Sequence, residues 1–180
     1  MGIPYQIAFI GHYTKDTIVS STGTRVVDGG AFNYGANVAA RMGLRVLAIS
    51  RLAREDAEVI RELKKTGVET LITWTQQSTC LRLVYPSDDP DERVIIVTNW
   101  AEPFSLKEII PIKSELIVVV ASMREEISSE IIKELSQKES VLAADIQSFL
   151  RVNDNGRLVA RPWPEKEEVL SCIDILKTDA

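Results

Sequence analysis

The stretch YQIAFIGHYTKD, residues 5–16, carries the pattern that decides the predicted fold. It begins with a short apolar run, which ends at Gly11 and is followed by polar residues. Short apolar runs bounded by turn residues are typical of buried parallel strands. Comparable runs occur later in the chain, at residues 45–49, 116–120, 141–144 and 173–176. The pattern therefore predicts a sheet of parallel strands.

Segments between these runs have apolar residues three and four positions apart, which is the spacing of amphipathic helices. They span residues 31–42, 55–65, 128–136 and 164–170. Gly43 and Gly67 follow the first two segments and are expected to end those helices. Because strands and helices alternate, the sequence predicts an α/β fold with a doubly wound, mostly parallel sheet.

Two β-rich segments, residues 17–27 and 69–99, interrupt this alternation. They are rich in Thr, Val, Ile, Tyr and Trp and contain turn clusters, so we interpret them as antiparallel strands. We expect them to form a small β lid within a single domain, residues 1–180. Their apolar residues exceed what one face of a small sheet needs, which indicates a homodimer surface. These residues are Val19, Val26, Leu71, Ile72, Trp74, Leu81, Leu83, Val94 and Ile96.

Composition and charge argue against several classes of function. The net charge is -5, and lysine and arginine are scattered among acidic residues, which disfavours nucleic-acid binding. Two cysteines without Cys-x-x-Cys spacing and a single histidine, His12, support neither a disulfide framework nor a metal site. The amino terminus lacks a signal-peptide pattern, and the longest apolar run, residues 116–121, is too short to cross a bilayer. We expect a cytoplasmic protein without a membrane partner.

Asp16 closes the quoted stretch, just past the end of the first predicted strand. Ligands in open α/β sheets lie beyond the carboxyl ends of the strands, and a carboxylate accepts hydrogen bonds from sugar hydroxyls. Asp16 is therefore a candidate ligand residue. On spacing alone, a solvent-exposed turn or a helix-capping aspartate is the more common role for such a residue.

Gly29 and Gly30 directly precede the first predicted helix. Paired glycines at that position let backbone amides approach a ligand closely, although such pairs are common. The sequence contains neither Gly-x-Gly-x-x-Gly nor Gly-x-x-x-x-Gly-Lys, so it offers no nucleotide fingerprint.

Taken in order, these segments resemble the ribokinase-like (PfkB) family of carbohydrate kinases. That family's amino-terminal signature is a strand, a glycine, a substrate-contacting aspartate, a β lid, a glycine pair and a helix ending Ala-Arg-x-Gly. The last motif is matched by Ala40 to Gly43. Further similar segments are residues 46–56, 67–70, 145–151 and 174–179.

The resemblance implies a kinase that phosphorylates a hydroxyl of a sugar or polyol, with ATP and Mg as cofactors of the intact enzyme. It implies that Asp16, Gly29 and Gly30 bind substrate. The family's usual substrate-contacting asparagine falls on Tyr34, with Asn33 one residue early. A tyrosine there would suit a ring polyol such as inositol, or could be a packed helix residue. Because Ala53 replaces the family's loop glycine, the resemblance makes Asp56 a helix cap rather than a ligand contact.

The family's catalytic Gly-Ala-Gly-Asp segment is not found in these residues, where Gly156 is the only glycine after Gly67. The resemblance therefore implies an incomplete ribokinase-like fold, in which the carboxyl-terminal nucleotide-binding part is absent. We expect no catalytic or metal-binding residue here, no tight binding of ATP or Mg, and no kinase activity from this portion alone. Relatives often dimerise through their lids, and the strand edge near residues 173–176 is a second candidate interface. The alternative is a non-catalytic small-molecule-binding or dimerisation module.

Overall fold

The computed structural model describes residues 5–89 and 92–178. A six-stranded sheet forms its centre, with the strand order β12-β9-β8-β1-β4-β5. All neighbouring strands of this sheet are parallel. The strands are β1 (Tyr5–Ile10), β4 (Val46–Ala53), β5 (Glu69–Thr75), β8 (Ser114–Val119), β9 (Val141–Asp145) and β12 (Ile175–Lys177).

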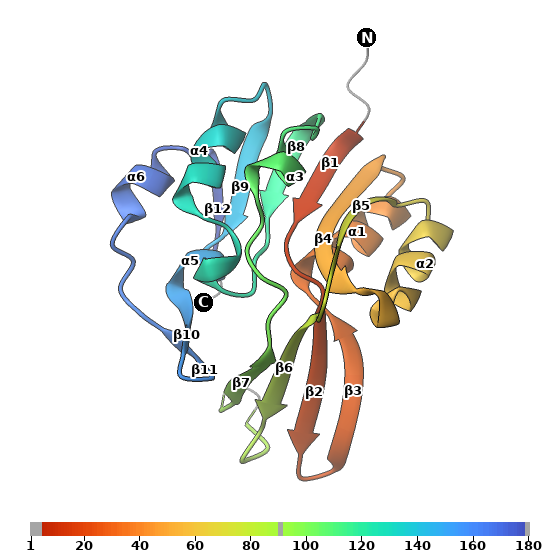
Figure 1. The fold of residues 1–180 in the computed structure, drawn as a ribbon, viewed down its shortest axis with the longest axis vertical. Coiled ribbons are helices and arrows are strands. Elements are labelled where there is room, and N and C mark those ends of the chain that lie inside the picture. Colours follow the sequence, from red (N-terminus) through yellow and green to blue (C-terminus); the bar gives the residue numbers. More distant parts are fainter. Residues whose placement is uncertain (1–4, 90–91, 179–180) are drawn as a thin grey trace.

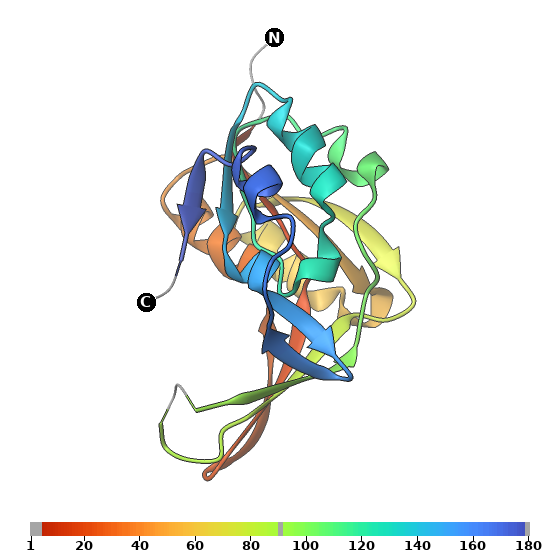
Figure 2. The same cartoon turned by 90° about the vertical axis from the view of Figure 1, so that its left-hand side faces the viewer.

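Helices cover both faces of this sheet (Figures 1 and 2). α1 (Ala31–Arg41) and α2 (Glu58–Lys65) pack on one face, and their buried side chains share a core cluster with Phe9. Ala8 and Ile10 of the same strand point to the other face and its separate cluster. That face carries α3 (Leu106–Ile109), α4 (Ser129–Ser136), α5 (Gln147–Leu150) and α6 (Lys166–Leu170). The predicted doubly wound sheet is confirmed.

Glycines end the first two helices, as the sequence predicts. Gly43 and Gly67 follow α1 and α2 with φ angles of 86° each, in the left-handed region that favours glycine. The short 3-10 turns η1 (Arg54–Asp56) and η2 (Arg124–Glu126) complete the helical elements of the described residues. No helix within the described ranges is long and apolar enough to cross a membrane.

The second sheet extends from the carboxyl end of β1 and forms the lower part of Figure 1. Its order is β10-β11-β7-β6-β2-β3, and its strand pairs are antiparallel except for β2 with β6. The strands are β2 (Thr14–Ser20), β3 (Gly23–Gly29), β6 (Thr79–Val84), β7 (Val94–Asn99), β10 (Arg151–Asp154) and β11 (Arg157–Ala160). We call this sheet the lid.

The lid differs from the prediction at two places. β5 was expected in the lid but pairs in parallel with β4, at the edge of the central sheet. One face of this edge strand packs on the α2 cluster while the other meets solvent, so its alternating pattern imitates a half-buried antiparallel strand. Conversely, the β10–β11 hairpin joins the lid. Its turn has Asn155 and Gly156 at φ angles of 50° and 85°, as an Asn-Gly hairpin requires.

Candidate functional site

The candidate site lies where β1 gives way to the β2–β3 hairpin, next to the start of α1. Gly29 at the end of β3 pairs with Thr14 on β2, so it lies directly against the side chains of Thr14 and Asp16. A Cβ atom at Gly29 would overlap the Asp16 carboxylate and would lie 2.5 Å from the Thr14 hydroxyl. Glycine is therefore required there for steric reasons.

Gly30 is restricted by both its backbone and its neighbours. Its φ angle is 92°, and a Cβ atom would lie 2.5 Å from the carbonyl oxygen of His12. It serves as the N-cap of α1, and its carbonyl accepts the amides of Asn33 and Tyr34. The glycine pair thus turns the chain from the lid into α1 in direct contact with the β1–β2 connection.

Asp16 has an unusual environment for a carboxylate. Its Oδ1 atom is buried and accepts no hydrogen bond from any described residue. Burial raises the pKa of Asp16, and the Thr14 hydroxyl opposes that shift only in part. A buried acceptor without a partner costs free energy, which a hydroxyl donor would recover. The arrangement is therefore suited to a ligand that donates hydrogen bonds.

Tyr34 lies close to this carboxylate. Its hydroxyl donates to the backbone carbonyl of Asp28 at 3.2 Å, and 56% of its residue surface is exposed. Burial, followed by the charges of Asp16 and Asp28, raises the pKa of Tyr34. Asn33 is instead buried on the packed side of α1, where its Oδ1 atom accepts from Asn37 at 3.1 Å. The structure thus brings Asp16, Gly29, Gly30 and Tyr34 together, while the hydrogen bond of Asn33 is made within α1.

Sequence reasoning did not single out Tyr13 or Asp28. The Tyr13 hydroxyl donates to Asp28 Oδ1 at 2.6 Å, and the Tyr13 amide donates to Ser50 Oγ at 2.7 Å. Burial, then the Asp28 carboxylate, raises the pKa of Tyr13. The available signal for Tyr13 was its place in the run after the first strand, at the carboxyl edge of the sheet. Asp28 lies on β3 and had no such signal.

Asp56 was expected to cap a helix, but its side chain links the lid to the central sheet instead. No side-chain cap is present at η1 or α2. Its Oδ1 atom accepts from Lys15 Nζ of β2 at 2.7 Å, and its Oδ2 atom accepts from Ser78 Oγ at 2.5 Å. The sequence could not reveal this link, because Lys15 is 41 residues away.

His12 contacts the lid through its side chain. Its buried ring lies with Nδ1 2.9 Å from Thr79 Oγ1 of β6 and 3.7 Å from Glu126 Oε1. Burial, followed by the charge of Arg51, lowers the pKa of His12 to about 3. Burial raises the pKa of Glu126 to about 7. Near neutral pH the histidine is therefore uncharged.

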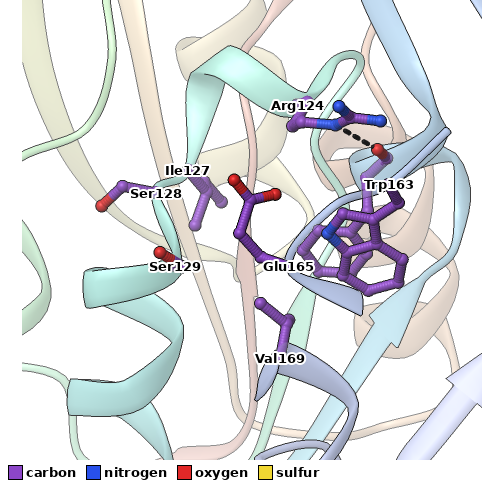
Figure 3. Close-up of a pocket in the computed structure, with 8 residues that line it drawn as sticks. Arg124, Ile127, Ser128, Ser129, Trp163, Glu165 and Val169 are labelled. Carbon is purple, nitrogen blue, oxygen red and sulfur yellow. Dashed lines mark hydrogen bonds between the residues drawn. The ribbon is translucent and has the colours of Figure 1, made fainter. Parts of the chain in front are cut away.

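A separate pocket of about 240 Å³ lies beside α4 and α6 (Figure 3). It contains none of the residues predicted to bind substrate. The Arg124 guanidinium donates to the backbone carbonyls of Phe149, Arg161 and Pro162, and Trp163 stacks on Phe149 with ring centroids 4.4 Å apart. Arg124 therefore fastens η2 to the segment that leads into α6.

No family model matches this sequence, and none of the curated proteins matches it. Solved structures do. A pyrophosphate-dependent kinase in the ribokinase family, complexed with a pyrophosphate analog and myo-inositol, is 29% identical with a TM-score of 0.89. The match covers 97% of this chain and 61% of that chain. The fold is ribokinase-like.

Two further structures extend the comparison. A pyrophosphate-dependent myo-inositol-1 kinase, converted into a myo-inositol-3 kinase, is 29% identical with a TM-score of 0.88, over 97% of this chain and 59% of that one. Ribokinase from Thermotoga maritima is 16% identical with a TM-score of 0.66, over 97% and 59%. The more distant match supports the fold alone. This chain spans about three-fifths of the length of these neighbours.

Proposed function

We propose that this chain is the substrate-binding part of a kinase that phosphorylates a ring polyol of the inositol type. The observation that carries the proposal is the buried Oδ1 atom of Asp16, which lacks a hydrogen-bond partner beside a glycine turn. A polyol supplies the hydroxyl donors that this atom lacks. Tyr34 at the same place offers an aromatic face and a hydroxyl. Two solved structures of 29% identity are a kinase complexed with myo-inositol and a myo-inositol kinase. This similarity favours a ring polyol over ribose as the substrate.

We expect the phosphate donor to bind outside the residues described here. The intact enzyme is expected to use ATP with Mg, and ribokinase from Arabidopsis thaliana was solved with ribose and ATP. The neighbours of higher identity are named as pyrophosphate-dependent. Within residues 5–89 and 92–178, no group of three or more His, Cys, Asp or Glu could hold a metal ion. The sequence also has no glycine-rich phosphate loop.

We therefore infer that donor binding and phosphoryl transfer depend on residues other than these. Catalysis of this reaction rests on positioning and on stabilising the transferred charge, and the residues expected for both are not in this sequence. A coupled assay of the chain with myo-inositol and either ATP or pyrophosphate should show no turnover. Turnover that Asp16→Ala abolishes would contradict this part of the proposal.

An interaction module is the second candidate function, and one observation favours it. Tyr34 and Val38 lie on successive turns of α1 and Met42 is its C-cap residue; they expose 56%, 59% and 74% of their surfaces. With Ile7, Phe9 and Leu44 they line an apolar groove of about 490 Å³. An exposed apolar surface of this kind usually marks an interface. We propose a homodimer on these grounds.

The two functions are separated by titration calorimetry with myo-inositol, ribose and fructose. The polyol proposal predicts weak binding of myo-inositol that Asp16→Asn abolishes. Asp88→Asn, in the exposed lid turn, is the matched control and should bind as the wild type does. If none of the three compounds binds while the chain dimerises, the interaction module is the better account.

A further inference from the structure

A buried carboxylate joins two loops beneath the candidate site. Glu126, on η2, has no solvent exposure. Its Oε2 atom accepts the backbone amide of His12 at 3.1 Å, and its Oε1 atom accepts the amide of Ser122 at 2.9 Å. His12 follows β1 and Ser122 follows β8, the neighbouring strand. One side chain thus holds the carboxyl-terminal loops of two central strands in register.

The peptide of His12 is also packed close to the glycine turn. Its amide donates to Glu126, and its carbonyl oxygen lies 2.5 Å from the position that a Cβ atom of Gly30 would take. On the other side, a Cβ atom at Gly11 would lie 2.5 Å from the carbonyl oxygen of Val120. Neither glycine leaves free space, and packed contacts of this kind transmit displacements. We therefore expect a movement of the His12 peptide to displace Gly30.

We propose that Glu126 is a positioning residue for the polyol site: its ionised carboxylate fixes the His12 peptide, which in turn sets the Gly29–Gly30 turn against Asp16. This inference rests on the proposed function, because the polyol is the ligand whose binding the turn would serve. Glu126 itself lies beneath the loop and acts only through it.

The charge on Glu126 decides how well it can do this. Both amide hydrogen bonds need an acceptor, and the ionised carboxylate offers two. When the carboxyl group is protonated, one oxygen becomes a hydroxyl donor. The hydrogen bond that this oxygen accepts from one of the two amides is then weakened. Because burial places the pKa of Glu126 at about 7, this change falls between pH 6 and pH 8. The site should be best ordered at the higher pH.

The other charged groups around Glu126 do not replace its charge. His12 is neutral, since its pKa is about 3. Arg51, whose charge acts on His12, is bound to Glu108 at 2.8 Å and lies 3.8 Å from Glu102. Arg124 is directed to the backbone carbonyls near α6, and Glu125 is exposed. Among these groups, Glu126 is therefore the one whose protonation state changes between pH 6 and pH 8.

Stability and binding should respond to pH in opposite directions. Glu126 has a raised pKa in the folded chain, against an ordinary value of 4.5. Its contribution to the free energy of unfolding is therefore fully present below pH 4.5 and is lost as the pH rises through about 7. Ligand affinity should instead increase as the carboxylate ionises, between pH 6 and pH 8. A purely structural role for Glu126 would not produce this opposition.

The test uses the full chain, labelled with ¹⁵N, and measures the amide signals of His12 and Gly30 from pH 5.5 to 8.5. Both should follow one transition with a midpoint near 7. The transition should disappear in Glu126→Gln and persist in Glu125→Gln. Titration with myo-inositol should give affinity about tenfold higher at pH 8 than at pH 6, with that difference absent in Glu126→Gln.

The outcomes are distinguishable. Gly30 signals that ignore the protonation of Glu126, or equal myo-inositol affinity at both pH values, would overturn the proposal. If Glu126→Gln does not fold, the pH series on the wild-type chain still tests whether His12 and Gly30 follow the protonation of Glu126. If the amides titrate as expected but myo-inositol does not bind at either pH, Glu126 still sets the turn and the proposed polyol function is wrong.

Discussion

At the scale of single residues, the environment of Asp16 costs stability, and this cost is the reason for proposing a ligand there. Its buried Oδ1 atom lacks a partner, and burial raises its pKa. The sequence identified this residue through its place after the first strand and through the family resemblance. It could not show the missing partner, because that depends on how the β2–β3 hairpin lies against the turn.

Asp16→Asn should separate function from stability. The substitution keeps the shape and removes a buried charge, so the free energy of unfolding should stay the same or rise. Affinity for myo-inositol should fall at least about tenfold, because a carboxylate acceptor is lost. Denaturant unfolding and calorimetry on the same samples measure both. A large loss of stability would show that Asp16 is structural.

Gly29→Ala tests the steric fit of the turn. The new methyl group would overlap the Asp16 carboxylate, so we expect a loss of roughly 1–3 kcal/mol in unfolding free energy and no polyol binding. Gly43→Ala is the control: its φ is 86° with open space around it, so it should cost roughly 1 kcal/mol and leave binding intact. Normal binding by Gly29→Ala would refute the assigned geometry.

At the scale of elements, the lid is attached to the central sheet through Lys15 and Asp56. The Asp56 side chain is only 5% exposed, while that of Lys15 is 41% exposed. Removing the lysine leaves a buried carboxylate with Ser78 as its remaining partner. Lys15→Met should therefore lower the free energy of unfolding by about 1 kcal/mol, after allowing for solvent screening.

Hydrogen exchange provides the readout for this attachment. Amides of β2 and β3 should exchange faster in Lys15→Met, while those of β8 keep their protection. Lys65→Met removes an exposed pair with Glu62 on α2 and should change little. Uniformly faster exchange in every strand would show that the ion pair is not specific to the lid.

Most elements of the central sheet could be predicted from apolar periodicity, because buried parallel strands and amphipathic helices leave strong patterns. β5 could not, because an edge strand with one solvent-facing side has the same alternation as a lid strand. The β10–β11 hairpin was visible as an Asn-Gly turn signal, but its pairing with β7 is a contact between distant segments. The link from Lys15 to Asp56 and the buried Glu126 were hidden for the same reason.

At the scale of the whole molecule, several candidate interfaces remain exposed. Val26 on the lid and Ile175 on β12 expose 59% and 53% of their surfaces. The exposed residues Tyr34, Val38 and Met42 form a third apolar region. Leu81, which was expected at the surface, is buried. Three of the apolar residues assigned to the lid, Leu71, Ile72 and Trp74, belong to β5 instead.

Light scattering should show a dimer of this chain. Val26→Asp, Val38→Asp and Ile175→Asp each place a charge on one of the three regions, which a dry interface would not accept. The variant that becomes monomeric identifies the interface. A wild-type chain that remains monomeric at high concentration would contradict the dimer.

The central claim is that a polyol binds at the turn between the lid and α1. Chemical-shift mapping of the labelled chain with myo-inositol tests it most directly. The claim predicts saturable shifts centred on Asp16, Gly29 and Gly30, and their disappearance in Asp16→Asn. Shifts confined to residues far from Asp16, or no shifts at millimolar myo-inositol, would contradict it.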